Sequence, residues 1–147
     1  MRQLVVILCA AVALGGLAAQ PVDARDQRTA SESTKVQAVL LQEVALFNRM
    51  RWRAAWRLYA PRVRSRCSYD RFVARMTPVI RATGRVTLRN LTVRVTGRRA
   101  IARYRIVAGG KVVGGTTTRS PDVFTRVGDR WFDDFDSDGL CPSGGAR

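Results

Sequence analysis

The chain has 147 residues, which is enough for one domain with its own core and too few for two. Hydrophobic residues make up 46% and charged residues 25%, a composition that excludes a disordered chain. Histidine is absent, which excludes Ser-His-Asp and Cys-His nucleophile systems and every histidine-containing metal site. The formal net charge is +15, and residues 49–105 hold 17 arginines against the single acid Asp70.

Residues 1–24 are predicted to be a secretory signal peptide. Met1-Arg2 is followed by an uncharged apolar run over residues 4–19 and then by small residues before a polar break, which is typical of an exported chain. Cleavage is expected after Ala24, with Ala19 as the competing site. The alternative is an uncleaved anchor, although the run is shorter than the ~20 residues of a membrane span. The sequence therefore predicts a protein that is secreted, periplasmic or held in the cell envelope.

Export predicts a disulfide bond. Removal of the signal peptide removes Cys9 and leaves Cys67 and Cys141, which would meet in an oxidising compartment. The bond would close a loop of about 75 residues and stabilise the fold by about 2–4 kcal/mol. The alternative, a redox-active thiol, usually has a partner in a CxxC motif, and the sequence contains none.

The first half of the mature chain is predicted to be helical. Residues 25–34 are polar and are expected to form a flexible linker. Ser33 or Thr34 is then expected to cap a long helix that runs to about Tyr59 and ends at Pro61. Ser68 caps a second, shorter helix, which Pro78 should break or kink near its end and which Gly84 closes.

From Val86 onward the apolar residues alternate with a period of two, which predicts strands. The phase slips at Asn90, which indicates a β-bulge and therefore a bent sheet. The further strands are expected around residues 100–106 and at residues 111–118, 123–127 and 130–135, separated by glycine-containing turns. Helices followed by an antiparallel sheet predict an α+β domain, in which N-terminal helices pack against a bent antiparallel sheet.

Three segments of the sequence resemble a known superfamily. They are Trp-x-x-Ala-Trp-x-x-Tyr-Ala-Pro over residues 52–61, Cys-Ser-Tyr-Asp-Arg-Phe over residues 67–72, and Gly-Asp-Arg-Trp-Phe over residues 128–132. Together with the order of elements, they resemble the exported bacterial branch of the nuclear transport factor 2-like superfamily, a cystatin-like cone. The resemblance covers residues 35–141 and leaves residues 142–147 as a flexible tail. It implies a sheet that wraps the helices and can enclose a small-molecule pocket.

This resemblance suggests a pocket and, as an alternative, a catalytic site. We expect the pocket to be lined by Trp52, Trp56, Tyr104 and Trp131. The enzymes that this resemblance brings to mind are isomerases, dehydratases and polyketide cyclases, which use a carboxylate in the pocket together with His or Tyr. In this chain that set would be Asp133 with Tyr59 or Tyr104.

The favoured function is nevertheless a non-catalytic binding or accessory module of the cell envelope. The alternative is a small lyase or isomerase of the polyketide cyclase or ketosteroid isomerase kind. A bound hydrophobic ligand and a raised pKa of Asp133 would favour the enzyme. A pair between Asp133 and Arg126 and a filled cone would favour the module.

A run of alternating carboxylates is a candidate calcium site. Asp134, Asp136 and Asp138 precede Gly139 as in the first half of a calcium-binding loop. Gly145 stands where the bidentate glutamate of a complete loop belongs. We therefore favour an acidic turn, and expect no cofactor.

A stripe of arginines is the candidate binding surface for a partner. It comprises Arg49, Arg53, Arg57, Arg62 and Arg64. Because the chain is expected to be exported, we expect an anionic component of the envelope rather than nucleic acid. The alternative is a solvated face without a partner. An exposed face of the sheet is a candidate surface for a homodimer.

Overall fold

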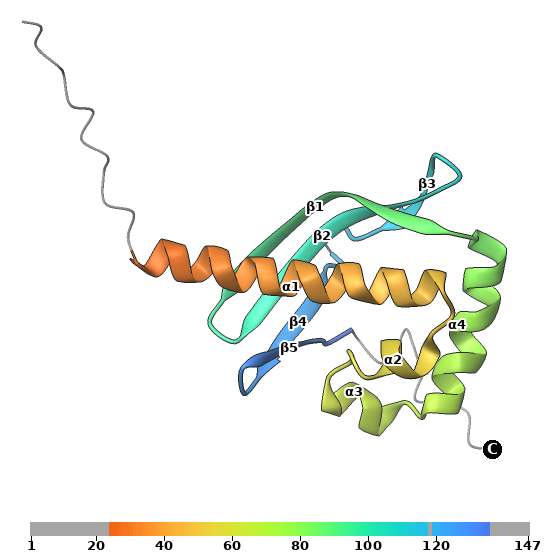
Figure 1. The fold of residues 1–147 in the computed structure, drawn as a ribbon, viewed down its shortest axis with the longest axis horizontal. Coiled ribbons are helices and arrows are strands. Elements are labelled where there is room, and N and C mark those ends of the chain that lie inside the picture. The colour runs from red at the N-terminus through yellow and green to blue at the C-terminus, as the bar shows by residue number, and fades with distance from the viewer. Residues whose placement is uncertain (1–23, 118, 136–147) are drawn as a thin grey trace, which may run out of the picture.

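The fold is α+β, with four helices packed on one side of a five-stranded antiparallel sheet (Figure 1). The structure, a computed structural model, describes residues 24–117 and 119–135. The helices are α1 (Ala24–Asn48), α2 (Trp52–Trp56), α3 (Pro61–Arg66) and α4 (Tyr69–Thr83). The strands are β1 (Val86–Thr96), β2 (Arg99–Ala108), β3 (Lys111–Gly115), β4 (Asp122–Val127) and β5 (Arg130–Asp133). No helix in these two ranges is long and apolar enough to cross a membrane.

Helix α1 begins earlier than the sequence predicts. Residues 25–34, expected as a linker, are helical, and the first turns extend beyond the edge of the sheet (Figure 1). Thr34 does not cap a helix, because its hydroxyl donates to the carbonyl oxygen of Ala30 within the helix. Glu32 ties this part to the sheet, since its carboxylate accepts a hydrogen bond of 2.7 Å from the indole of Trp131.

The predicted continuous helix to Tyr59 is interrupted after Asn48. Met50 has a positive φ of 51°, and the amide of Arg51 donates back to the carbonyl oxygen of Leu46, so the chain turns sharply before α2. The turn places Trp52 against Phe47, with ring centroids 6.0 Å apart. Burial of these aromatic rings outweighs the continuation of one helix.

Asn48 locks the end of α1 to the start of the sheet. Its side-chain amide donates to the carbonyl oxygen of Val86 at 2.8 Å and accepts from the amide of Val86 at 2.8 Å. This pair of bonds mimics a strand partner for Val86. It therefore fixes the point at which β1 leaves the helices.

Pro61 begins α3 rather than ending a helix, because proline needs no amide partner in the first turn. Ser68 caps α4 as predicted, and its hydroxyl accepts from the amide of Arg71 at 3.3 Å. Pro78 lies inside α4, which continues to Thr83, so the predicted break does not occur. Gly84, with a φ of 72°, ends the helix as predicted.

The sheet is bent where the sequence predicts. The register of β1 against β2 shifts between Arg89 and Thr92, and Asn90 has a positive φ of 55°. One edge of β2 is shared by two strands, since β3 pairs with residues 105–108 and β4 with residues 99–102. Strand β5 pairs with β4 in the predicted hairpin. The bent sheet curves over α1 (Figure 1).

The core consists of two clusters on either side of α1. One joins α2, α3 and α4 and contains Phe72, whose ring lies 5.0 Å from Trp56 and 5.4 Å from Tyr59. The other joins α1 to the inner face of the sheet through Val36, Leu40, Ala100, Ala102, Phe124 and Trp131. Tyr59 belongs to the first cluster and extends its hydroxyl toward α1. The space between the two clusters holds the candidate site.

Candidate functional site

A cavity of about 380 Å³ lies between α1, α4 and the inner face of the sheet. Its wall is mostly apolar. The contributing side chains are Leu40, Val44 and Phe47 from α1, Met76 and Val79 from α4, Val86 and Leu88 from β1, Ile106 from β2 and Val113 from β3.

Three carboxyl side chains line this apolar cavity. Glu43 comes from α1, Asp122 from β4 and Asp133 from β5, and each residue is only 3–4% exposed. A buried carboxyl is unfavourable unless it is hydrogen-bonded or neutralised. A group of three therefore needs an explanation beyond packing. We call Glu43, Asp122 and Asp133 the carboxyl cluster.

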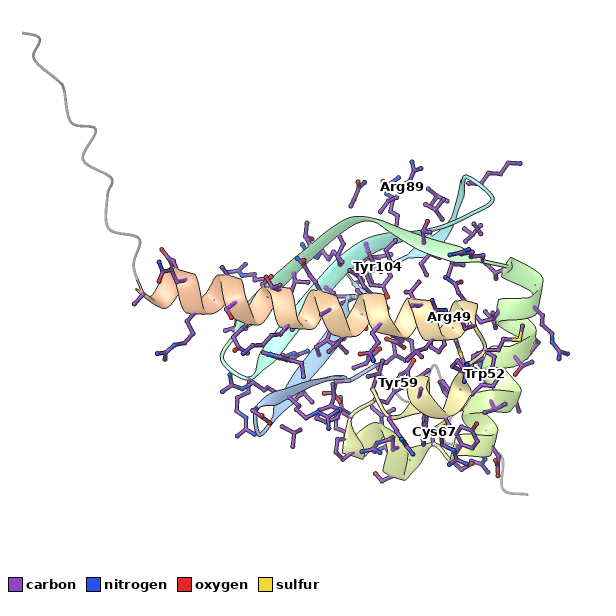
Figure 2. The ribbon with its side chains drawn as sticks, in the orientation of Figure 1. Arg49, Trp52, Tyr59, Cys67, Arg89 and Tyr104 are labelled. Carbon is purple, nitrogen blue, oxygen red and sulfur yellow. The ribbon has the colours of Figure 1, made fainter. Side chains whose placement is uncertain are left out.

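Two tyrosines donate hydrogen bonds to the carboxyl cluster. The hydroxyl of Tyr59 donates to Glu43 Oε1 at 2.5 Å, and the hydroxyl of Tyr104 donates to Asp122 Oδ2 at 2.8 Å. Figure 2 shows Tyr104 on the side of the sheet that faces α1 and Tyr59 below α1. The second oxygens, Glu43 Oε2 and Asp122 Oδ1, are buried and have no hydrogen-bond partner in the described part of the chain.

The backbone holds Asp133 beside Tyr59. The amide of Asp133 donates to the carbonyl oxygen of Leu58 at 2.9 Å, and its carbonyl oxygen accepts from the amide of Ala60 at 2.7 Å. Tyr59 and Asp133 thus form an isolated parallel β-bridge. The carboxylate Oδ1 also accepts a hydrogen bond of 2.8 Å from the amide of Phe135. The short segment after α2 is therefore joined to the end of β5.

Burial raises the pKa values of the whole cluster. It raises the pKa of Glu43 to about 7, against the opposing hydrogen bond from Tyr59. It raises the pKa of Asp122 to about 6, against the hydrogen bond from Tyr104. The pKa of Asp133 lies well above its usual range because of burial and the nearby charges of Glu43 and Asp122. The three groups therefore differ in protonation near neutral pH.

Both tyrosines stay protonated. Burial and the surrounding carboxylates raise the pKa of Tyr59 and that of Tyr104 well above the usual value. Each hydroxyl therefore remains a donor across the physiological pH range. The phenols fix the orientation of the carboxylates and carry no charge themselves.

The structure places only one of the four predicted pocket residues at the cavity. Tyr104 lines it. Trp52 and Trp56 instead pack in the aromatic cluster of α2 and α4, and Trp131 packs between α1 and the sheet. The residues of the alternative catalytic set, in contrast, all line the cavity: Asp133, Tyr59 and Tyr104.

The alternative pairing of Asp133 with Arg126 is wrong. Arg126 Nη1 lies 3.3 Å from Glu32 Oε2, so its charge partner is on α1. Asp133 lies at the other end of the hairpin face, beyond Trp131. The absence of this pair among the described residues, the raised pKa of Asp133 and the unfilled cavity are the features expected of the enzyme rather than of a packed module.

Glu43 and Asp122 were missed at the sequence level, although a signal for both exists. Glu43 follows Val36 by seven residues and Leu40 by three, which is an inward position of the helical stripe. Asp122 precedes Phe124 by two residues, so both lie on the same face of β4. An acid at an apolar position of the pattern indicates a functional carboxyl.

The candidate calcium site lies mostly outside the described residues. Asp134 is described and forms an ion pair with Arg62, with Nε 2.5 Å from Oδ1. Asp136 and Asp138 lie outside residues 24–135, so this site stays a prediction. Within residues 24–117 and 119–135, no group of three or more Cys, Asp or Glu side chains is arranged to hold a metal ion.

The same limit applies to the predicted disulfide and signal peptide. Cys67 is fully buried at the end of α3. Its predicted partner Cys141 lies outside the described residues, as do residues 1–23. Both features therefore remain predictions.

The predicted basic stripe is exposed but does not lie on one helix. Arg49 falls in the turn after α1, Arg53 in α2, and Arg62 and Arg64 in α3. Arg53 lies over the ring of Tyr69, with 3.9 Å from its guanidinium carbon to the ring centroid.

The structure adds a second basic surface on the outer face of the sheet. It comprises Arg89, Arg94, Arg99, Arg103 and Arg105, all exposed. Arg89 and Arg105 are directly paired across β1 and β2. Figure 2 shows Arg89 on the side of the sheet away from α1. Like charges at directly paired positions destabilise a sheet, so this pair costs some stability.

Comparisons with known proteins supply no family for this chain. No protein-family model matches it, and no curated protein matches its sequence. The carboxyl cluster, the cavity and the distribution of charge are therefore the features of this chain that bear on its function.

Proposed function

We propose that the protein is a small binding module of the cell envelope whose cavity takes a small, largely apolar molecule. The observation that carries this proposal is the pair of buried, unpartnered carboxylate oxygens, Glu43 Oε2 and Asp122 Oδ1, in a cavity of about 380 Å³. Leaving a buried acceptor unsatisfied costs about 1–3 kcal/mol. A ligand with hydrogen-bond donors would recover that cost on binding, and the apolar wall would bury its remaining surface.

Export and superfamily membership belong to this proposal. The apolar segment at residues 4–19 supports export, and the helices beneath a bent antiparallel sheet support a nuclear transport factor 2-like cone. The basic surfaces fit the anionic polymers and lipid headgroups of an envelope. In this proposal the cavity binds the ligand, while the two basic surfaces bind the protein to anionic components of the envelope.

Native mass spectrometry of the protein from its own envelope fraction tests the proposal. We expect a co-purified small molecule in the wild-type protein and none in Ile106→Trp, because the larger ring fills the cavity. Thr125→Trp is the matched control, since Thr125 lies in a separate groove with Arg62 and Arg99 on the outer side. A ligand retained equally by Ile106→Trp would place binding outside the cavity and contradict the proposal.

A proton-transfer enzyme is the second candidate, favoured by the separation of pKa values within the carboxyl cluster. Glu43, with a pKa of about 7, is suited to act as the general base. Asp133, whose pKa is raised further, would stay protonated and donate a hydrogen bond to a developing enolate. This assigns to Glu43 the role of base that the sequence suggested for Asp133.

Isomerisation of 3-cyclohexenone to its conjugated isomer tests this second candidate. Glu43 would remove a proton from the carbon between the carbonyl group and the double bond, and return it to the far carbon of the dienolate. We expect Glu43→Gln to abolish the reaction and Glu32→Gln, on the same helix but outside the cavity, to preserve it. No turnover above the buffer rate by the wild-type protein would exclude this chemistry for simple enones.

A further inference from the structure

The polar side of the cavity offers acceptors for hydrogen bonds, and its two phenol donors are already used. The phenol hydrogens of Tyr59 and Tyr104 are already directed at Glu43 and Asp122. What remains are the buried oxygens Glu43 Oε2 and Asp122 Oδ1, which accept no hydrogen bond from the described residues while the cluster is ionised. Glu43 also shares a hydrogen bond with Asp133 when Asp133 is protonated. A ligand that brings donors is therefore complementary to this surface, whereas one that brings only acceptors is not.

The carboxyl cluster is also uncompensated in charge. Two other acids whose side chains are little exposed do have basic partners: Glu32 pairs with Lys35 and Arg126, and Asp134 pairs with Arg62. None of the three cavity carboxyls forms an ion pair with any residue that the structure describes. In a chain with a net charge of +15, this pocket of negative potential is the exception.

The remaining surface of the cavity is hydrocarbon. Leu88, Ile106 and Met76 line its wall. Val79 and Val113 line it too and are 49% and 54% exposed, so the apolar surface continues to the mouth. Arg75 also lines the cavity but is an exposed residue, and its charge is screened by solvent.

From this arrangement we infer that the cavity selects a small apolar amine. This inference rests on the proposed binding function and specifies its ligand. The protonated nitrogen would lie between Glu43 and Asp122 and donate to their unpartnered oxygens, while the hydrocarbon body packs against Leu88 and Ile106. An ammonium group satisfies two acceptors at once and neutralises the buried charge, which a hydroxyl group does not.

Three probes with the same hydrocarbon body test the inference. They are 1-aminoadamantane, 1-adamantanol and 1-adamantanecarboxylate, measured by isothermal titration calorimetry at pH 7.5. We expect the amine to bind about tenfold more tightly than the alcohol, and the carboxylate to bind weakest. Asp122→Asn should remove most of the advantage of the amine over the alcohol. The matched control is Glu32→Gln, which should change neither affinity.

The pH dependence of the wild-type protein gives a second readout that needs no variant. The titratable and charged groups facing the ligand are Glu43 on α1, Tyr59, Arg75 on α4, Tyr104 on β2, Asp122 on β4 and Asp133 on β5. Both tyrosines stay protonated between pH 5 and 7.5, because their pKa values are raised. Protonation of Glu43 and Asp122 toward pH 5 should therefore weaken the amine and leave the alcohol nearly unchanged.

The outcomes separate this inference from the function on which it rests. If the alcohol or the carboxylate binds as tightly as the amine, and Ile106→Trp abolishes that binding, the cavity is a ligand site and the amine is the wrong class. If none of the three probes binds, both the inference and the binding function are contradicted. Affinity for the amine that Asp122→Asn leaves intact would likewise overturn the inference.

Discussion

The carboxyl cluster should make the protein lose stability as the pH rises from 5 to 7.5. Burial raises the pKa of Glu43 from 4.5 to about 7 in the folded protein. The folded state therefore retains a proton that the unfolded state has already released. Stability from this group is fully present below pH 4.5 and is lost as the pH rises through 7.

The magnitude follows from the difference in proton uptake. At about 1.36 kcal/mol per pKa unit, Glu43 alone lowers the free energy of unfolding by about 2 kcal/mol between pH 5 and 7.5. Asp122 and Asp133 shift in the same direction and enlarge the fall. The chain lacks histidine, so no ordinary side chain masks this effect in the same interval.

Urea unfolding monitored by tryptophan fluorescence at pH 5 and pH 7.5 measures the fall directly. Glu43→Gln should reduce the change in the free energy of unfolding between pH 5 and pH 7.5, because glutamine does not titrate. Glu32→Gln should lower stability at both pH values without changing the dependence, because hydrogen bonds from Lys35 and Trp131 hold the pKa of Glu32 at about 2. Stability that is constant or rises over this interval would refute the reasoning, since the carboxyls would then titrate in their ordinary range.

Three further substitutions test the elements that hold the cavity open. Phe72→Ala should lower the free energy of unfolding by about 3–5 kcal/mol, because the ring of Phe72 contacts Trp56 and Tyr59 in the first core cluster. A urea midpoint close to that of the wild type would contradict this prediction. Asn48→Ala should lower the free energy of unfolding by about 1–2 kcal/mol, because it removes both hydrogen bonds to Val86. Urea unfolding measures this loss, and an unchanged free energy would show that β1 needs no such anchor. Gly115→Ala should lower the thermal midpoint far more than Gly128→Ala. A Cβ atom at position 115 would lie 2.5 Å from the carbonyl oxygen of Tyr104, whereas one at position 128 would face open space. Equal effects of the two substitutions would argue against this close approach.

The strands were predictable because their signal is local. The bulge at Asn90, the turns at Gly97 and Gly109 and the inward face of Trp131 and Asp133 all follow from the alternation of apolar residues and the position of glycines. The α+β class is confirmed on these grounds.

The helices were less predictable because their ends depend on tertiary contacts. Nothing near Asn48 in the sequence announces that α1 ends there, since the end is set by bonds to Val86, far along the chain. The extension of α1 through residues 25–34 likewise depends on Glu32, which contacts Trp131 and Arg126. Local propensity carries no information on such partners.

The site was predictable in part for the same reason. Asp133 with Tyr59 or Tyr104 was the alternative catalytic set suggested by the resemblance, and all three residues line the cavity. The tryptophans were assigned to the pocket that the resemblance implied, whereas large aromatic rings often fill a core, as Trp56 does beside Phe72. Glu43 was passed over because an acid on a helix is usually exposed.

The central claim is that the cavity between α1, α4 and the sheet is a ligand site. The most direct test is NMR observation of intermolecular NOEs between the tightest-binding adamantane derivative and the methyl groups of isotope-labelled protein. We expect NOEs to Leu88, Ile106 and Val113, which line the cavity. NOEs confined to outward-facing methyl groups such as those of Val123 and Val127, or no NOEs under saturating ligand, would contradict it.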